Sequence, residues 1–144
     1  MIGLYGGTFA PVHNGHLRFA IEAGEQLGLD AVHLLACAQP PHRAAPAIDG
    51  RRRHDWLVRA LAGAPHLVAD DDELLRAGPS YTVDTLARAR ERFPGQTLLW
   101  LLGADAFNSL HTWHRWEALF EQAHLVVAAR PGPVSYTHLR AHET

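Results

Sequence analysis

Apolar runs and amphipathic runs alternate along this chain of 144 residues. The runs that are short and apolar enough to form strands are residues 2–5, 31–37, 66–69, 97–102 and 125–129. The runs whose apolar residues recur at helical spacing are residues 15–27, 52–62, 80–93 and 116–122. Strands that alternate with helices predict an α/β fold: a doubly wound, Rossmann-like parallel sheet of about five strands with helices on both faces.

Two polar segments are predicted to face solvent. The Pro-rich residues 39–50 are typical of a surface loop. The acidic residues 70–73, of sequence Asp-Asp-Asp-Glu, are expected to form a solvated turn. In the helix over residues 80–93, the side chains expected to point outward are Arg88, Arg90 and Arg92. In a parallel sheet, ligands bind at the carboxyl ends of the strands where the strand order reverses, so the remaining polar clusters are the candidate site.

Composition excludes several classes of protein. Cys37 is the single cysteine, which excludes an intramolecular disulfide and a multi-cysteine metal site. All 13 basic residues are arginine, so a Walker phosphate loop and a lysine Schiff base are impossible. A net charge of −2 argues against a nucleic-acid partner. The chain shows no signal peptide and no apolar run near ~18 residues, which indicates a cytoplasmic protein that does not enter membranes.

A glycine-rich motif lies between the first predicted strand and the first predicted helix. It reads Gly6-Gly7-Thr8-Phe9-Ala10-Pro11-Val12-His13-Asn14-Gly15-His16. The paired glycines would let backbone amides approach a ligand closely. A helix that begins near Gly15 would direct its unpaired N–H groups and the positive end of its dipole at the same space. The motif therefore predicts an anion site that His13 and His16 can reach together.

Three interpretations of His13 and His16 are open on the residues alone. The two side chains could cap or pack the start of the helix. They could bind a metal, although no cysteine or nearby carboxylate completes such a site. They could also clamp a phosphate by donating hydrogen bonds to oxygens that gain charge during phosphoryl transfer. The glycines favour the phosphate clamp, and the motif differs from the G-x-G-x-x-G fingerprint of NAD-dependent dehydrogenases.

The motif Gly-Gly-Thr-Phe-x-Pro-x-His-x-Gly-His resembles the signature of the nucleotidyltransferase superfamily. Its opening is most similar to the bacterial nicotinate-nucleotide adenylyltransferases. Further segments resemble that family in the same order: Pro40-Pro41-His42-Arg43, Arg53 with Trp56-Leu57, Pro79-Ser80-Tyr81-Thr82 with Thr85-Leu86, Gly103-Ala104-Asp105, Thr112-Trp113-His114 and Arg130-Pro131-Gly132. The resemblance covers residues 1–132 as one domain.

The resemblance implies an enzyme that transfers the adenylyl group of ATP to nicotinate mononucleotide. The products are nicotinate adenine dinucleotide and pyrophosphate, and Mg²⁺ assists with ATP. The 5′-phosphate of the mononucleotide is the nucleophile, so the protein needs no covalent residue. Catalysis would then consist of positioning and charge stabilisation.

The resemblance also implies the site residues. The catalytic residues would be His13 and His16, which hold the ATP phosphates and the transferred group. The other residues expected to bind ATP or its phosphates are Gly6, Gly7, Thr8, Phe9, Gly15, His42 and Arg43. The residues expected to bind the pyridine nucleotide are Ser80, Tyr81, Thr82, Gly103, Asp105, Trp113 and His114. No metal ligand is expected among the side chains.

Plainer interpretations stand beside these roles. We expect Ser80 to cap the helix that follows it in any case. Asp105 could also be a helix cap rather than a ribose ligand. Trp113 could be an ordinary packing residue rather than the ring that stacks on the pyridine. Trp116 is expected to lie in the core, and the paired arginines Arg51-Arg52 are expected to be solvated.

Two features depart from the family. Ala10 stands where the family usually has aspartate, which removes a polar contact from the turn. The family continues beyond Arg130-Pro131-Gly132 through a further strand and a Ser-x-x-Ile-Arg segment that helps to hold ATP. Residues 133–144 resemble translated adapter or vector sequence instead, and we expect them to lie outside the fold. We therefore expect a carboxyl-terminally truncated fold, incomplete at its C-terminus, with weak or no activity.

Other functions compete with this one. A sister adenylyltransferase could act on nicotinamide mononucleotide or on phosphopantetheine, although the phosphopantetheine enzymes usually have threonine where His13 stands. A fragment that binds nucleotide without catalysis is a second alternative. A role in binding nucleic acid is supported only by Arg51-Arg52-Arg53 and is rejected. We make no prediction of oligomeric state.

Overall fold

The computed structural model describes residues 1–40, 46–128 and 136–139. Its strands are β1 (Ile2–Gly7), β2 (Ala31–Ala36), β3 (Leu67–Asp70), β4 (Leu98–Leu102), β5 (His124–Ala128) and β6 (Tyr136–Leu139). Its α-helices are α1 (Asn14–Leu27), α2 (Gly50–Leu61), α3 (Thr82–Arg92), α4 (Ala104–Asn108) and α5 (Leu119–Gln122). Short 3₁₀ helices are η1 (Asp72–Leu75), η2 (Leu110–Thr112) and η3 (Trp116–Ala118). No described helix is long and apolar enough to cross a membrane.

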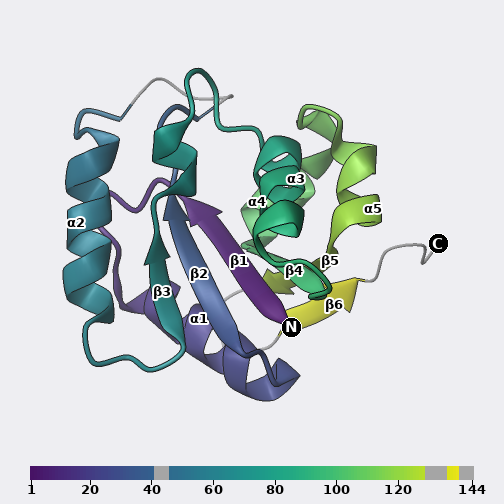
Figure 1. The fold of residues 1–144 in the computed structure, drawn as a ribbon, viewed down its shortest axis with the longest axis horizontal. Helices are drawn as coiled ribbons and strands as arrows, with labels where there is room; N and C mark the ends of the chain where they lie inside the picture. Colours follow the sequence, from purple (N-terminus) through teal and green to yellow (C-terminus); the bar gives the residue numbers. More distant parts are fainter. Residues whose placement is uncertain (41–45, 129–135, 140–144) are drawn as a thin grey trace.

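The strands form one sheet in the order β3-β2-β1-β4-β5-β6 (Figure 1). The pairs from β3 through to β5 are all parallel, which confirms the predicted doubly wound, Rossmann-like sheet. Strand order reverses between β1 and β4, because the chain first builds outward through β2 and β3 and then returns to the other side of β1. Crevices for ligands form at such a reversal, outside the carboxyl ends of the strands.

The end of the chain differs from expectation. Residues 133–144 are expected to lie outside the fold, yet β6 adds to the sheet antiparallel to β5, with Val127 paired to Thr137. The physical reason is that β5 would otherwise be an edge strand. Its outer backbone groups offer hydrogen bonds to any extended segment nearby, so pairing there depends little on sequence.

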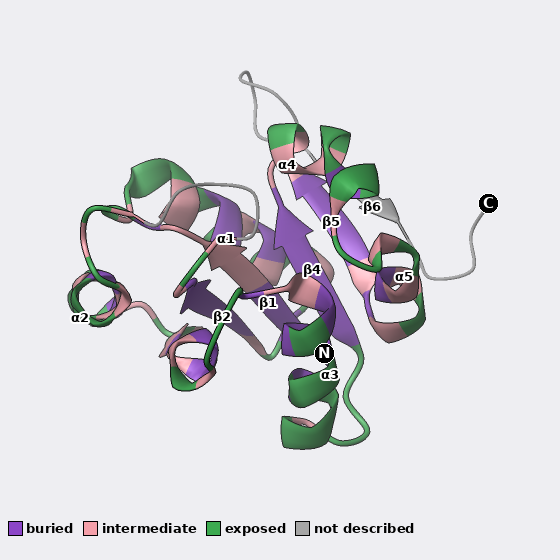
Figure 2. Cartoon of the chain, turned by 90° about the horizontal axis from the view of Figure 1, so that it is seen from above, coloured by how far each residue is buried: buried purple, intermediate pink, exposed green. Residues whose placement is uncertain are grey.

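Two apolar cores separate the helices from the sheet. One face of the sheet packs against α1 and α2 through Phe19, Ala20, Leu57 and Leu61. The other face packs against the helices of the second half; the buried residues there include Val83, Leu86, Leu110 and Leu119. Figure 2 shows the buried residues on the central strands and on the helix sides that face them. Every residue of β4 is buried, as expected for a central parallel strand.

The helices end where the local sequence dictates. α1 stops at Gly28, whose φ of 65° is left-handed and unfavourable for residues with a side chain. α2 begins after Asp49, whose Oδ1 accepts a hydrogen bond from the N–H of Arg52 at 3.0 Å. The helix expected over residues 116–122 divides into η3 and α5, and the short elements α4 and η2 were not anticipated.

The acidic segment 70–73 is not a solvated turn, which corrects the prediction. Asp70, Asp72 and Glu73 are only 5%, 4% and 3% exposed. Arg88 and Arg92 of α3 are exposed, as predicted, and they also pair with this segment. Arg88 donates to both carboxylate oxygens of Asp72, and Arg92 donates to Oδ2 of Asp70 at 2.8 Å. Ion pairing thus outweighs the preference of these charges for water.

Candidate functional site

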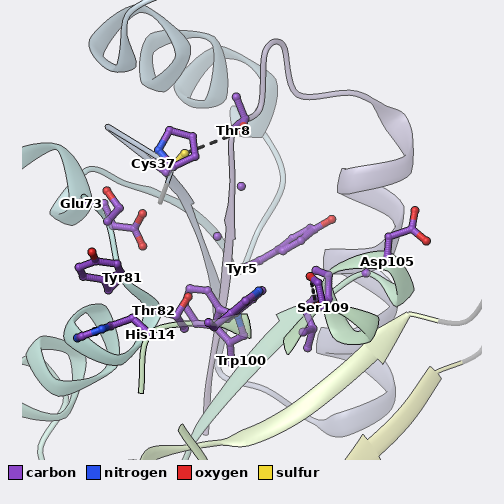
Figure 3. A pocket seen from close by; sticks show the side chains of 18 residues that line it. Tyr5, Thr8, Cys37, Glu73, Tyr81, Thr82, Trp100, Asp105, Ser109 and His114 are labelled. Atoms are coloured by element: carbon purple, nitrogen blue, oxygen red, sulfur yellow. Dashed lines mark hydrogen bonds between the residues drawn. The ribbon is translucent and has the colours of Figure 1, made fainter. Parts of the chain in front are cut away.

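A cavity of about 310 Å³ opens at the carboxyl ends of β1 and β4, where the strand order reverses (Figure 3). Its volume is at the lower end of the range for small-molecule sites. The sequence-predicted residues that line it are Gly6, Gly7, Thr8, Ser80, Tyr81, Thr82, Gly103, Asp105, Trp113 and His114. These residues come from segments far apart in the chain, and the topology of the sheet brings them together.

Other predicted residues lie outside the cavity wall. Phe9, His13, Gly15 and His16 do not line it. Phe9 is buried in the core that packs against α1, where its ring contacts the Tyr5 ring edge-on. His42 and Arg43 fall outside the described residues. Residues that line the cavity without having been predicted include Tyr5, Cys37, Glu73 and Trp100.

Close packing requires glycine at position 6. A β-carbon on Gly6 would lie 2.8 Å from the ring of Trp100, a distance that real β-carbons do not reach. The indole of β4 therefore fills the space beside the first glycine of the turn. Because no side chain intervenes, the backbone of the turn forms the cavity wall itself.

A buried arginine holds the glycine-rich turn from behind. Arg53 of α2 is 0% exposed, and its Nη1 donates to the carbonyl oxygen of Thr8 at 2.7 Å. Its Nε donates to the carbonyl oxygen of Ile48 at 2.9 Å. The next residue in the turn, Phe9, has a φ of 47°, which a residue with a side chain rarely adopts. Arg53 thus anchors the turn directly before its most strained residue.

His13 and His16 form a reciprocal cap at the start of α1. Nδ1 of His13 accepts from the N–H of Gly15 at 3.1 Å, and Nδ1 of His16 accepts from the N–H of His13 at 3.0 Å. The two rings stack, with centroids 3.6 Å apart and planes at 22°. This arrangement agrees with the capping interpretation left open by the sequence, and it leaves Nε2 of each ring for a second interaction.

The cap also fixes the protonation of the rings. A ring nitrogen that accepts a hydrogen bond carries no proton, so each neutral imidazole holds its proton on Nε2. Burial, and to a smaller extent the nearby charge of His13, lower the pKa of His16 to about 4. His16 is therefore neutral at pH 7, with an Nε2–H donor.

The free amides expected at this helix start are largely occupied. The N–H of Gly15 binds the His13 ring, and the N–H groups of His16 and Leu17 bind the carbonyl oxygen of His13. Among the described residues, only Asn14 of this first turn has no hydrogen bond to its N–H. The positive dipole end remains, but the donors available to an anion are chiefly the two Nε2–H groups.

Tyr5 connects the histidine pair to the cavity. Its side chain lines the cavity, and its ring contacts the His16 ring edge-on with centroids 6.2 Å apart. Burial raises the pKa of Tyr5 to about 12, so the phenol is neutral. The turn therefore presents two adjoining surfaces, the histidine pair on one side of Tyr5 and the cavity on the other.

Ser80 does not cap α3, which corrects the prediction. The residue at the cap position is Tyr81, and its side chain makes no capping hydrogen bond. Ser80 instead ties this segment to the end of β2: its N–H donates to the carbonyl oxygen of Gln39, and its Oγ accepts from the N–H of Ala38. The start of α3 is thereby held against the cavity.

Tyr81 and His114 form a pair of rings in the cavity wall, and Trp113 lines the same cavity. The Tyr81 and His114 rings lie 4.3 Å apart at an angle of 31°. Trp113 is half-buried; it lines the cavity and also packs against the core beneath α3, so its stacking and packing interpretations are compatible. Trp116 packs against the same core, as predicted.

Asp105 lies in the first turn of α4 rather than at its cap, which is Gly103. Its side chain is exposed and lines the cavity, so it is accessible to a ligand hydroxyl. The arginines expected to be solvated, Arg51 and Arg52, are exposed. Within the described ranges, no group of three or more His, Cys, Asp or Glu side chains is arranged to hold a metal ion.

Around the site, the sequence analysis did not predict the burial of Arg53 and Glu73. Arg53 falls on the same helical face as Leu57 and Leu61, at the spacing of one and two turns, and that placement is the signal of a buried arginine. Glu73 had no such signal, because its burial depends on residues of α3 that follow it in the chain. Burial also raises the pKa of the Cys37 thiol, which keeps it protonated.

The family model described as cytidylyltransferase-like matches residues 4–143. The chain belongs to the cytidylyltransferase-like family. This cytidylyltransferase-like chain is 52% identical over 131 residues to the probable nicotinate-nucleotide adenylyltransferase of Pseudomonas paraeruginosa, covering 90% of this chain and 61% of that protein. It is 51% identical over 132 residues to the protein of the same name from Methylococcus capsulatus, covering 91% and 63%. The chain thus spans about three-fifths of the length of these relatives.

A solved structure shares the fold. Nicotinic acid mononucleotide adenylyltransferase of Plasmodium falciparum, in complex with NaAD, superposes with a TM-score of 0.74 at 17% identity. The match covers 88% of this chain and 62% of that one. At this identity the likeness shows that the cytidylyltransferase-like chain shares the fold of that structure, and no more.

Proposed function

We propose that this chain transfers the adenylyl group of ATP to nicotinate mononucleotide. The observation that carries the proposal is the pair of surfaces around Tyr5: a histidine pair whose helix cap uses only the Nδ1 atoms, beside a cavity lined by aromatic residues. One surface suits a polyphosphate and the other suits a nucleotide with a flat ring. The names of relatives about half identical to the chain support the same assignment.

In this proposal the cavity holds the pyridine nucleotide. Trp113 offers an aromatic face to the pyridine ring, and the start of α3 at Thr82 directs backbone N–H groups toward its carboxylate. Asp105 accepts a hydrogen bond from a ribose hydroxyl. The remaining contacts come from the cavity-lining residues Ser80, Tyr81, Gly103 and His114.

ATP binds on the glycine-rich turn. The backbone of Gly6, Gly7 and Thr8 borders the nucleotide, while His13 and His16 donate from Nε2 to phosphate oxygens. The positive end of the α1 dipole adds to the attraction for the phosphates. Phe9 and Gly15 support this surface indirectly, since Phe9 is buried below it and Gly15 is bonded to His13.

The transfer itself requires no covalent residue. A 5′-phosphate oxygen of the mononucleotide attacks the α-phosphorus of ATP, a new P–O bond forms, and the bond to the β-phosphate oxygen breaks to release pyrophosphate. Negative charge accumulates on the oxygens around the α-phosphorus and on the leaving group. Imidazoles that donate from fixed positions stabilise this charge without reorganising, and each such donor typically contributes about 10²–10³ in rate.

Mg²⁺ enters this proposal bound to the triphosphate of ATP, whose oxygens are the ligands that it prefers. The ion would neutralise charge on the departing pyrophosphate. A cytoplasmic location agrees with ATP as substrate and with Cys37 as a free thiol.

The assay that tests the proposal is pyrophosphate release from ATP and Mg²⁺ with nicotinate mononucleotide, nicotinamide mononucleotide or phosphopantetheine. We expect release with nicotinate mononucleotide, at a rate below that of the longer Pseudomonas paraeruginosa relative assayed beside it. Release only with nicotinamide mononucleotide or phosphopantetheine would replace the proposed substrate. Nucleotide binding by folded protein with no release would replace catalysis with a binding role.

A further inference from the structure

Glu73 is a buried carboxyl group on the wall of the cavity. Its side chain is 3% exposed, and Figure 3 shows it beside Tyr81. Thr85 Oγ1 donates to Glu73 Oε2 at 2.8 Å, and Arg76 Nη2 donates to Thr85 Oγ1 at 2.6 Å. Oε1 of Glu73 has no hydrogen-bond partner among the described residues. One oxygen is therefore held by the protein, and the other is available to a ligand.

The hydrogen bond to Thr85 places Glu73 against the start of α3. Thr85 lies in the first turn of that helix, and its N–H donates to the carbonyl oxygen of Tyr81. On the other side, Oε2 of Glu73 lies 3.9 Å from the position of a β-carbon on Gly6. The carboxyl group thus lies between the glycine-rich turn and the helix start proposed above to meet the ring carboxylate.

Charged and titratable groups approach Glu73 from several elements. Asp72 precedes it in η1 and Asp70 ends β3, while Arg76 follows η1. Cys37 follows β2 and interacts with Glu73 electrostatically. The titratable side chains that share the cavity wall with it are Tyr5 of β1, Tyr81 before α3, Asp105 of α4 and His114.

Both protonation states of Glu73 are accessible near neutral pH. Burial raises its pKa to about 7, against the opposing effects of the Thr85 hydrogen bond and the Arg76 charge. The carboxylates of Asp72 and Asp70 contribute to this rise in pKa. When protonated, Glu73 can donate a hydrogen bond to an anion, whereas the ionised group can only accept one and repels an anion.

We propose that Glu73 is a specificity-determining residue: its carboxyl group faces the ring substituent of the bound pyridine nucleotide, and ionised Glu73 disfavours a ring carboxylate relative to a ring amide. This inference rests on the proposed function. The protonated form accepts the nicotinate ligand and donates to its carboxylate. Binding of nicotinate mononucleotide is therefore coupled to proton uptake at Glu73, and binding of the neutral amide is not.

The coupling sets a measurable pH dependence. If nicotinate mononucleotide binds only the protonated form, its Kd rises about tenfold between pH 6 and pH 8 for a group that titrates near 7. The phosphate of the ligand also titrates in this range. Nicotinamide mononucleotide carries the same phosphate and meets the same histidines, so the ratio of the two Kd values isolates the response to the ring carboxylate.

The experiment measures the Kd of both mononucleotides for the wild-type chain by calorimetry at pH 6, 7 and 8. We expect the ratio of nicotinate to nicotinamide Kd to rise about tenfold over this range. In Glu73→Gln, which keeps the shape and removes the charge, the ratio should be flat. In Asp71→Asn, which removes a carboxylate from the same segment away from the cavity wall, the ratio should rise as in wild type.

The outcomes separate this inference from the proposed function. A flat ratio in the wild-type chain overturns the role of Glu73 even if Glu73→Gln fails to fold. A rise that persists in folded Glu73→Gln also overturns it and points to His114, the cavity-lining imidazole, instead. If neither mononucleotide binds wild-type protein at any pH, the proposed function fails and this inference fails with it.

Discussion

Nδ1 of His16 accepts a hydrogen bond from the backbone N–H of His13 at 3.0 Å, and the two rings stack 3.6 Å apart. The two histidines therefore form one unit: each caps the helix start through Nδ1 and presents Nε2 to the outside. The capping role and the proposed phosphate role use different atoms of the same rings. Substitutions at these histidines can therefore separate the capping role from the phosphate role.

His16→Gln should retain the cap but displace the phosphate donor, because the amide NH2 of glutamine does not occupy the position of the imidazole Nε2–H. Glutamine at this third helical position is a normal partner in a capping box, so the free energy of unfolding should change little. His16→Ala should lose about 1 kcal/mol of stability as well as the donor. Both variants should lower the rate of pyrophosphate release by about 10²–10³.

The matched control for these variants is His111→Ala, which removes an exposed histidine of η2 that does not line the cavity. Its rate should equal that of wild type. Turnover by His16→Ala at the wild-type rate would refute the proposed donor role, whatever happens to stability.

Arg53→Met should weaken the fold and the turn together. Methionine keeps much of the volume but leaves the carbonyl oxygens of Thr8 and Ile48 without their charged donor. We expect a loss of about 2–4 kcal/mol in the free energy of unfolding, measured by urea denaturation. Arg53→Lys retains a charge and should lose less; equal stability of wild type and Arg53→Met would contradict the anchoring role.

Asp70 should make the fold sensitive to acid. Burial alone would raise the pKa of Asp70, but hydrogen bonds from His33 and Arg92 outweigh burial and hold the pKa well below its usual range. A carboxyl group with a depressed folded-state pKa contributes stability above its unfolded pKa, about 3.9, and loses that contribution as the pH falls further. Wild-type stability should therefore drop below about pH 4.

Asp70→Asn provides the comparison for this pH dependence. At pH 7 it should be less stable than wild type by about 3 kcal/mol, because Arg92 loses its buried partner. The difference between the two proteins in urea midpoint should shrink as the pH falls from 4 toward 2. A difference that stays constant with pH would show that the carboxylate is not the stabilising group.

Gly6→Ala should disturb the cavity by a steric clash. Its β-carbon would lie 2.8 Å from the Trp100 ring, and overpacking of this kind costs about 1–3 kcal/mol. Gly103→Ala is the matched comparison, because a β-carbon there meets no atom within 4 Å. Its free energy of unfolding should stay within about 0.5 kcal/mol of wild type. Equal thermal midpoints for the two variants would contradict the packing argument.

The sequence predicted the sheet because alternation of apolar and amphipathic runs is a local signal that parallel α/β folds share. β4, apolar at every position, was expected to be buried and is buried. The polar segments that follow β1, β3 and β4 were expected to meet, and residues such as Gly7, Tyr81 and Asp105 do line one cavity. Local patterns sufficed here because strand direction alone determines which ends come together.

Other features depend on contacts that no local pattern encodes. The burial of Asp72 relies on Arg88, sixteen positions later, so the acidic run resembled an ordinary solvated turn. Ser80 resembled a helix cap, but the end of β2 provides its partners instead. The strand β6 forms because β5 has an open edge, and edge pairing places few demands on sequence.

The central claim is that adenylyl transfer takes place at the surfaces around Tyr5. The most direct test is to measure which product receives each labelled phosphorus of ATP. Purified chain, shown to be folded by circular dichroism, is incubated with Mg²⁺, nicotinate mononucleotide and ATP labelled at either the α- or the γ-phosphorus. We predict that the α-label appears in nicotinate adenine dinucleotide and the γ-label in pyrophosphate, with both reduced in His16→Gln. Absence of label from the dinucleotide, with the longer Pseudomonas paraeruginosa relative active in the same assay, would contradict the account.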